Sequence, residues 1–599
     1  MTDHPQQPPR TPLRPLPRIL DARAQGVNPE SIERENLRVR REQVRDVGRR
    51  RAEWRILFLA AAFFAGYAAI GAKMGMLAAT PVVEAEPWVG EGISGERADI
   101  LDRNGRVLAT NLVTHSLYAE LRYMIDGPRA AHELARIFPD MDEERLAAQL
   151  TDPNRRFVWL RSRLSPEQEQ AAHDIGEPGL LLGQRDMRLY PNGSLAAHVL
   201  GGTAYGEQGV TAAEIQGVAG IEYDLNERLS DADLADVPVA LSLDLGVQAI
   251  VEEVLAGGID MLNAIGGSAI LMDVHTGEIV ALASAPVFDP NDRPAPPASL
   301  AEQEVSPLFN RSVQGLYELG SVMKAFALAQ ALELGLVTRD TMIDTRGPLR
   351  FGRFSIRDYH NYGAQMSVED IFIHSSNIGT ARISQLIGGE RQRAFLQQFG
   401  FLDPLQLELP EARRPQPQYD PRWSDLSMMT ISYGHGLSLT PMHLAAGYAA
   451  IVNGGTLVQP TLQRRASVVP GPRVISEETS RIMRTLMREV VTEGTASMGE
   501  VEGYVVGGKT GSADKPNPQG GYYEDRLVAT FAGAFPMNDP RYVIVVTMDE
   551  PQDTSGAVAR RTAGWTVVPV AAEIVRRAAP VLGMRPQDPA DVEAALRLR

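Results

Sequence analysis

The sequence predicts an α+β chain with two folded modules behind a single membrane-spanning helix. In the region 237–581, strand hairpins enclose a helical middle, which is the pattern of a sheet packed with helices. A charge-free apolar run at 56–72, extended by 74–79, precedes both modules and is long enough to span a bilayer. With 599 residues and 44% hydrophobic side chains, the chain can bury more than one core. The region 87–235 is therefore expected to fold as a separate mixed module.

The amino-terminal region is rich in proline and arginine. Six prolines before residue 18 argue against regular structure, so 1–29 is expected to be disordered. The first 55 residues contain 13 arginines, several of them directly before the apolar run. Such flanks stay on the cytoplasmic side, so 1–55 is predicted to be a cytoplasmic tail and 56–79 a retained anchor. A buried core helix and a cleavable signal peptide are the weaker alternatives, because a signal peptide starts closer to the amino terminus.

Composition excludes several classes of function. A net charge of −16 repels nucleic acid, so no nucleic-acid partner is expected. The absence of cysteine removes disulfides, thiolate nucleophiles and cysteine metal sites. The ten histidines show no metal-binding spacing, and His374 and His435 are interpreted as structural. Neither a metal nor a cofactor is predicted.

Strand hairpins are expected at both ends of the larger module. Apolar runs flank turn-rich connectors at 273–277 and at 538–540. Helices are expected between the hairpins, at 321–334, closed by Gly335, and at 368–387. The expected strands are 268–272, 278–284, 504–512, 527–535 and 542–548.

The first candidate catalytic residues are Ser321 and Lys324, at the start of the expected helix 321–334. Residues three apart share a helix face, so Lys324 can reach the Ser321 hydroxyl. The backbone N–H of Ser321 has no helical partner there and can face developing negative charge. A serine needs a base, and lysine serves only where burial or a nearby cation keeps it neutral. Taken alone, this pattern fits a helix cap beside a surface lysine equally well.

The scarcity of lysine sharpens that interpretation. Only four lysines occur among 59 basic residues, so arginine is the usual cation of this chain. Because arginine cannot lose its proton in a protein, a base at position 324 has a chemical reason to be lysine. The same Ser-x-x-Lys spacing at 512–515 lies at an expected strand end and is interpreted as accidental.

Two further motifs make the first one specific. Ser375-Ser376-Asn377 and Lys509-Thr510-Gly511 each occur once, and either alone is more often an ordinary loop than a site. In this order behind Ser321 and Lys324, they resemble the motif trio of penicillin-binding transpeptidases and serine β-lactamases. The resemblance implies that Ser321 is the nucleophile and Lys324 its base. Ser375 would relay a proton to the leaving nitrogen, and Asn377 would orient Lys324 and the substrate amide.

The third motif is implied to bind the substrate. Lys509 would attract the terminal carboxylate of a D-alanyl-D-alanine stem peptide, which the hydroxyls of Thr510 and Ser512 would hold. Gly511 would let the strand backbone approach closely. The backbone N–H groups of Ser321 and Ser512 would form the oxyanion hole. Attack would release D-alanine and leave an acyl-serine, which an amine of a neighbouring stem peptide resolves and which a β-lactam would stall.

The chain resembles class B penicillin-binding proteins nearly end to end. Arg97–Gly105, Arg188–Gly201 and Gly217–Asp224 are similar to their pedestal signatures. The resemblance predicts a transpeptidase (serine β-lactamase-like) domain at 237–581, an elongated mixed α/β pedestal (dimerisation-like) at 87–235 and a carboxy-terminal tail at 582–599. The anchor and pedestal disfavour a secreted β-lactamase, and the pedestal signatures disfavour a bifunctional glycosyltransferase.

Within class B the resemblance is closest to the division-specific FtsI type, in its α-proteobacterial form. Leu319 replaces a common proline and Ser512 the usual threonine, which keeps the hydroxyl. This subtype implies septal cross-linking at the inner membrane, with a periplasmic catalytic domain. Two alternatives stay open: an elongation-specific transpeptidase, and a divisome scaffold with secondary catalysis. The implied partners are stem peptides, β-lactams, a SEDS-type glycosyltransferase (FtsW-like) and other divisome membrane proteins.

Overall fold

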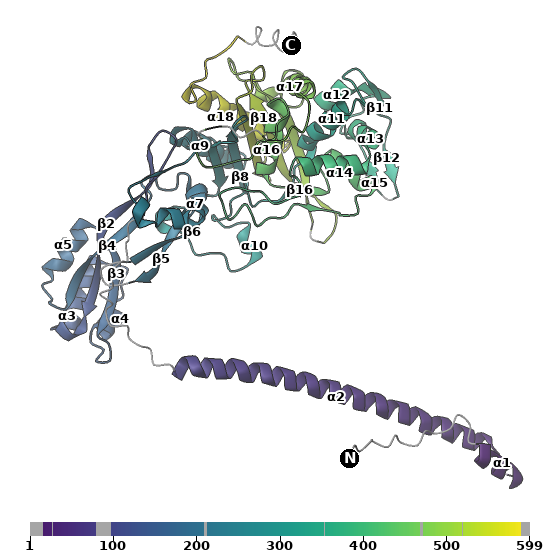
Figure 1. The fold of residues 1–599 in the computed structure, drawn as a ribbon, viewed down its shortest axis with the longest axis horizontal. Coiled ribbons are helices and arrows are strands. Elements are labelled where there is room, and N and C mark those ends of the chain that lie inside the picture. The colour runs from purple at the N-terminus through teal and green to yellow at the C-terminus, as the bar shows by residue number, and fades with distance from the viewer. Residues whose placement is uncertain are drawn as a thin grey trace. The chain divides into compact units, whose positions relative to one another are not determined.

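The computed structural model describes residues 16–26, 28–79, 97–208, 213–352, 354–465, 467, 471–517 and 519–588 (Figure 1). The chain divides into two compact units, Met1–Trp88 and Val89–Arg599. Three parts of the sequence predictions lie outside the described residues. They are 1–15 of the amino-terminal tail, the start of the pedestal before residue 97, and 589–599 of the carboxy-terminal tail.

Two helices, α1 (Leu16–Ala24) and α2 (Glu30–Ala79), form the described part of the first unit. The predicted disorder is therefore wrong for the residues of α1. Pro17 does not break this helix, because the N–H groups of a first turn have no helical partner to lose. Ile19 and Ala22 are the buried residues of α1.

The apolar run predicted to be the anchor lies inside α2. Several of its large apolar side chains face solvent, among them Phe58, Phe64 and Tyr67, which are 80%, 77% and 72% exposed. Among the described residues, no helix is both long enough and apolar enough to cross a membrane.

The second unit begins with a mixed module of strands and helices. Its sheet has the order β3-β2-β1-β7, and β4 also pairs with β2. Leu117 and Ala119 of β2 pack with helices α3, α4 and α5 in a small core of their own. The strands are β1 (Ile100–Leu101), β2 (Val107–Glu120), β3 (Phe157–Leu164), β4 (Leu180–Leu189), β5 (Gly202–Gln208), β6 (Ala213–Ala219) and β7 (Val239–Ala240). The helices are α3 (Gly127–Ile137), α4 (Glu143–Leu150), α5 (Pro166–Asp174), α6 (Ala197–Leu200), α7 (Gly220–Asp224) and α8 (Asn226–Leu229).

A buried charge cluster joins the three pedestal signatures. Glu222 accepts hydrogen bonds from Arg97 Nε and from Arg188 Nε, both at 2.7 Å. Arg97 also donates to Asn226 Oδ1 at 2.9 Å, and Tyr190 donates its hydroxyl to Glu222 at 3.3 Å. The side chains of all three charged residues are at most 1% exposed. These residues therefore hold the pedestal together, because a buried charge requires a partner.

The first signature also connects the pedestal to the larger module. Asp102 Oδ2 accepts the backbone N–H of Leu245, the first residue of helix α9 (Leu245–Met261), at 3.1 Å. Arg103 pairs with Glu278 at 2.8 Å. The signature segment thus bonds to a helix and to a strand connector of the larger module, which supports its interpretation as a structural segment.

The larger module is built on a five-stranded antiparallel sheet of order β17-β18-β19-β8-β9. The two predicted hairpins and the predicted neighbouring strand are confirmed as its members. Helices α9 and α18 pack together on the sheet, and α16 and α17 form a second packed pair on it (Figure 1). The sheet consists of β8 (Gly266–Asp273), β9 (Ile279–Ala285), β17 (Gly507–Pro516), β18 (Tyr522–Phe535) and β19 (Tyr542–Asp549). The other three helices are α16 (Pro441–Val452), α17 (Glu477–Thr492) and α18 (Val567–Val581).

A helical half inserted between β9 and β17 completes the α+β fold that the sequence predicts. It also contains small sheets of two or three short strands. Its helices are α10 (Leu300–Gln303), α11 (Lys324–Glu333), α12 (Val368–Ile373), α13 (Asn377–Ile387), α14 (Gly389–Gln398) and α15 (Asp425–Ser432). Its strands are β10 (Tyr317–Glu318), β11 (Met342–Asp344), β12 (Leu349–Phe351), β13 (Phe354–Ile356), β14 (Gln365–Ser367), β15 (Gln418–Tyr419) and β16 (Leu437–Leu439).

The predicted helix at 368–387 is divided in the structure. It consists of α12 and α13, separated by residues 374–376. Ser375 has a φ of 63°, a left-handed conformation that a helix cannot contain. The break places the second motif at the start of α13 rather than on the side of a continuous helix.

Loss of the central carboxylate should destabilise the pedestal. In Glu222→Gln, two buried guanidinium groups lose their counter-charge, and we expect a loss of about 3 kcal/mol or more in the free energy of unfolding. Thermal and denaturant unfolding of the purified chain measures this. The control is Glu133→Gln on α3, whose pair with Arg136 is exposed, and it should change stability by about 0.5 kcal/mol or less. Equal stability of the two variants would contradict a structural role for the cluster.

Candidate active site

Ser321 lies in a single turn of 3-10 helix, Gly320–Met323, directly before α11. Gly320 has a φ of 63° and donates its N–H to the carbonyl of Gly434 at 3.2 Å. A Cβ atom on Gly434 would lie 1.9 Å from the Gly320 carbonyl oxygen, so only glycine permits this approach. The predicted helix start is confirmed, and on one side its backbone is fixed by the loop that contains Gly434, called the 434 loop below.

Strand β17 approaches the same turn from another side. A Cβ atom on Gly511 would lie 2.2 Å from the Leu319 carbonyl oxygen. A Cβ atom on Gly320 would in turn lie 2.9 Å from the Ser512 carbonyl oxygen. The expected close backbone approach at Gly511 is therefore present. It brings the third motif beside the first, although nearly 190 residues separate them in the sequence.

Lys324 is buried between the first and second motifs. Its Nζ lies 2.6 Å from the Ser375 carbonyl oxygen, 3.0 Å from Ser375 Oγ and 2.7 Å from Asn377 Oδ1. The two carbonyl oxygens can only accept, so they take both hydrogens of a neutral amine. The lone pair of that amine is then left to accept a proton from a hydroxyl. This geometry is compatible with a lysine that acts as a base.

Burial lowers the pKa of Lys324 well below its usual range. The positive charge of Lys509 lowers this pKa further, whereas the carboxylate of Asp358 raises it. Burial also lowers the pKa of Lys509 to about 7. The Lys509 ammonium lies 5.9 Å from the centre of the Phe372 ring. Two buried amines in one site therefore disfavour each other's charge, which favours the neutral form of Lys324 near neutral pH.

The remaining predicted residues lie along β17. Thr510 shares a hydrogen bond with Thr495 between their hydroxyl oxygens at 2.6 Å. The Ser512 hydroxyl accepts the backbone N–H of Ala563 at 2.9 Å. A serine hydroxyl that accepts in this way keeps its own proton to donate. Ser512 can therefore still donate to a ligand.

The Ser321 side chain is half-buried, and within the described ranges its hydroxyl has no hydrogen-bond partner. The expected contact with Lys324 is thus not a hydrogen bond in this structure. Such catalytic contacts often tighten only when substrate is present. The structure brings all three motifs together and leaves the Ser321 hydroxyl available.

Two family models match the chain at these modules. The penicillin-binding protein transpeptidase domain matches residues 267–567, and the penicillin-binding protein dimerisation domain matches 92–233. The probable peptidoglycan D,D-transpeptidase FtsI of Caulobacter vibrioides is 33% identical over 88% of this chain and 89% of that protein. The chain belongs to the class B penicillin-binding proteins. It is a serine-type peptidoglycan D,D-transpeptidase, as the sequence predicts.

More distant relatives show the same relationship. Penicillin-binding protein PbpB of Mycolicibacterium smegmatis is 31% identical over 76% of this chain and 79% of that protein. FtsI of Escherichia coli is 28% identical over 81% of this chain and 86% of that protein. The crystal structure of penicillin-binding protein 3 from Mycobacterium tuberculosis, complexed with aztreonam, superimposes with a TM-score of 0.62. The two chains are 25% identical, and the match covers 83% of this chain and 98% of the other.

Sequence reasoning missed the role of Glu318 in this class B site. The carboxylate accepts the Gly436 N–H at 2.9 Å and the Tyr522 hydroxyl at 3.2 Å, and it pairs with His435 Nδ1 at 3.0 Å. His435, which the sequence analysis interprets as structural, is held by this carboxylate. The only signal in the sequence was the position of Glu318 three residues before Ser321.

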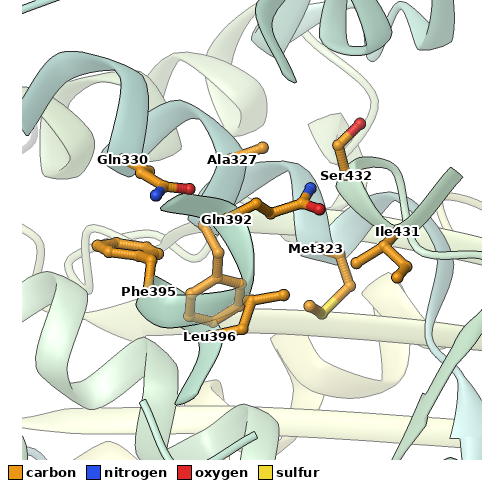
Figure 2. A pocket seen from close by; sticks show the side chains of 9 residues that line it. Met323, Ala327, Gln330, Gln392, Phe395, Leu396, Ile431 and Ser432 are labelled. Atoms are coloured by element: carbon orange, nitrogen blue, oxygen red, sulfur yellow. The ribbon is translucent and has the colours of Figure 1, made fainter. Parts of the chain in front are cut away.

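A small cavity lies within the helical half, behind α11 (Figure 2). Its space is about 10 Å³, which is at the limit for one water molecule. Met323, Ala327, Gln392 and Leu396 are among the residues that line it. None of the predicted site residues lines this cavity, and it is too small to hold a stem peptide.

Replacement of Lys324 by arginine should abolish catalysis. In Lys324→Arg the positive charge remains, but the base is lost because a guanidinium keeps its proton. We expect the rate of D-alanine release from D-alanyl-D-alanine peptides to fall by about 100-fold or more. The control is Lys515→Arg at the accidental Ser-x-x-Lys match, where the lysine pairs with Asp549 and Glu550, and this variant should keep its rate. An active Lys324→Arg enzyme would rule out this lysine as the base.

Proposed function

We propose that this chain cross-links septal peptidoglycan through an acyl-serine on Ser321 and that β-lactams inhibit it at the same residue. The observation that carries the proposal is the burial of the Lys324 amine against two carbonyl acceptors beside a turn that presents Ser321. This arrangement supplies a neutral base next to a hydroxyl, which nucleophilic catalysis by serine requires.

Acylation would begin with transfer of the Ser321 proton to the lone pair of Lys324. The Ser321 oxygen attacks the carbonyl carbon between the two D-alanines, and the backbone N–H groups of Ser321 and Ser512 stabilise the oxyanion, each by about 3 kcal/mol. Ser375, 3.0 Å from Lys324 Nζ, passes the proton to the leaving nitrogen. The C–N bond breaks and D-alanine departs, leaving the acyl-serine.

Deacylation would complete the cross-link. An amine of a neighbouring stem peptide attacks the acyl carbon and loses a proton to Lys324, the C–O bond breaks, and Lys324 gives that proton to the Ser321 oxygen. Asn377 holds Lys324 through Oδ1 at 2.7 Å and orients the substrate amide. Both half-reactions use the same base, which returns to its neutral state after each turnover.

Substrate binding is assigned to β17. Lys509, with a pKa of about 7, carries part of its charge at neutral pH and becomes more fully charged when a carboxylate arrives. The hydroxyls of Thr510 and Ser512 donate to that carboxylate. Gly511 allows the strand to lie against the nucleophile turn and so places these groups at the correct distance from Ser321.

Covalent labelling tests this assignment. A fluorescent penicillin should label the full chain, and mass spectrometry should locate the adduct on Ser321. Ser321→Ala should lose the label with unchanged thermal unfolding, because its half-buried side chain lacks hydrogen-bond partners in the described structure. Ser555→Ala, at an exposed position, should label normally. The proposed chemistry is wrong if Ser321→Ala still forms the adduct.

The inhibitor part of the proposal is supported by a structural relative. The penicillin-binding protein 3 of Mycobacterium tuberculosis, with the same fold, has been solved in complexes with aztreonam and with ampicillin. A β-lactam would acylate Ser321 as the stem peptide does, but its leaving group stays tethered. The acyl-enzyme would then be stalled.

The proposal places the chain in the inner membrane through residues 56–79, with 1–55 cytoplasmic and the catalytic module periplasmic. The absence of charge at 56–72, the helical conformation of α2 through this run and the exposure of its aromatic side chains support the anchor. A septal role is supported by the similarity to proteins named FtsI. A SEDS-type glycosyltransferase (FtsW-like) and other divisome membrane proteins would be its partners, through the anchor and pedestal.

Localisation of a tagged chain tests this part. The full chain should be found in the membrane fraction and concentrate at midcell in dividing cells. Deletion of 56–79 should release it from the membrane and abolish the midcell band. A sidewall distribution would instead support the elongation-specific alternative, and membrane retention of the deletion variant would refute the anchor.

A further inference from the structure

Asp358 lies in the loop between β13 and β14 and bonds to the second motif. Its Oδ1 accepts the backbone N–H groups of Asn377 at 2.5 Å and Ile378 at 3.0 Å, and its Oδ2 accepts the Ser376 hydroxyl at 2.7 Å. These are the first N–H groups of α13, which have no helical partner and favour a carboxylate. One side chain therefore fixes three consecutive residues.

These bonds hold a strained backbone in place. Ser375 immediately precedes the three residues and has a left-handed φ of 63°, which costs energy for a residue other than glycine. Ser376 is buried and also caps α13 by accepting the Gly379 N–H at 2.9 Å. Such a conformation persists only where the surroundings impose it, and here Asp358 and the cap impose it.

The same loop orients the amide of Asn377. The Arg357 carbonyl oxygen accepts from Asn377 Nδ2 at 3.1 Å, which turns Oδ1 toward Lys324. Residues 357–358 therefore determine both where Ser375 presents its carbonyl and which end of the Asn377 amide faces the amine. The positions of the two carbonyl acceptors of the Lys324 amine are therefore set by this loop.

Asp358 also acts on Lys324 through its charge. Among the described residues, the hydrogen-bond partners of the Lys324 amine are Ser375 and Asn377, which are uncharged, and the charged groups that act on it are Lys509 from β17 and Asp358 from the loop. Lys509 disfavours the ammonium, whereas Asp358 favours it. The balance of these two charges sets the pH at which the base becomes available.

The loop is itself held in place by packing. Leu349 of β12 and Ile356 of β13 are buried in a core cluster with Ile378 and Ala381 of α13. The β12–β13 hairpin is therefore attached to the helix whose amino terminus Asp358 binds. This attachment gives the carboxylate a fixed position relative to the second motif.

We propose that Asp358 is a positioning residue of the transpeptidase reaction, which holds the second motif in its active conformation through its hydrogen bonds and acts on Lys324 through its charge. This inference rests on the proposed function, because it assigns Lys324 as the base. Asp358 touches neither substrate nor the reacting atoms, and acts through Ser376, Asn377 and its charge.

The test is the pH dependence of acylation of the full chain by a fluorescent penicillin. Asp358→Asn removes the charge and one acceptor, so the plateau rate should fall by about 10- to 100-fold. Loss of the negative charge favours neutral Lys324, so the acid limb should move to lower pH. Asp358→Glu keeps the charge but misplaces the carboxylate, so its plateau should fall while its acid limb stays nearer that of the wild type.

Two controls make the outcomes decisive. Asp344→Asn on β11 removes a half-buried carboxylate bonded to Arg346 and should leave plateau and acid limb unchanged. Thermal unfolding of each variant separates folding from rate. If Asp358→Asn does not fold, Ser376→Ala replaces it: this variant keeps the charge, so its plateau should fall with an unmoved acid limb.

Three results would overturn the inference. The first is a wild-type plateau rate in Asp358→Asn. The second is a reduced plateau rate with an unmoved acid limb in Asp358→Asn, which would leave Asp358 as a helix cap only. The third is a wild-type plateau rate in Ser376→Ala. Failure of the wild-type chain to form an adduct on Ser321 would instead refute the proposed function.

Discussion

Burial of the Lys324 amine is the constraint on which the catalytic module depends. An ammonium group loses its hydration on burial, and carbonyl oxygens from Ser375 and Asn377 compensate for only part of that loss. Ser375 Oγ lies within hydrogen-bond distance of the same nitrogen, so burial and the charge of Lys509, rather than a lack of acceptors, lower the pKa of the amine. The main-chain carbonyl of Ser375 and the side-chain amide of Asn377 meet at this nitrogen where α12 ends and α13 begins.

The pedestal solves a related problem in the opposite way. Arg97 and Arg188 are as deeply buried as Lys324, but arginine keeps its proton, and a carboxylate between them provides the counter-charge. The result is a fixed joint between signature segments that are far apart in the chain. In the pedestal a carboxylate lies directly between the buried guanidinium groups, whereas the hydrogen-bond partners of Lys324 are uncharged.

Glycine makes the convergence of the motifs possible. Contacts at Gly320, Gly434 and Gly511 bring the nucleophile turn, the 434 loop and β17 closer than any side chain would allow. These contacts involve the backbone, so the positions of the Ser321 and Ser512 N–H groups depend on the sheet and not on flexible side chains. Glu318 of β10 adds hydrogen bonds to the loop that contains Gly434 and Gly436 and to Tyr522 of β18. The site therefore lies at the boundary between the sheet and the helical half.

The sequence by itself determined the α+β class, the strands of the central sheet, the three motifs and the family, because hydrophobic periodicity and short motifs are local properties. It could not place residues that act through space. Asp358 has no local signature, since it is 18 residues from Ser376 and reaches α13 only because β12 and β13 pack on that helix. The same holds for Glu222, whose two arginine partners come from other segments, and for the break at Ser375, where tertiary hydrogen bonds override helix propensity. Only the tertiary structure lowers the pKa of Lys324, because its burial and the charge of Lys509, opposed by the charge of Asp358, depend on where three distant segments meet.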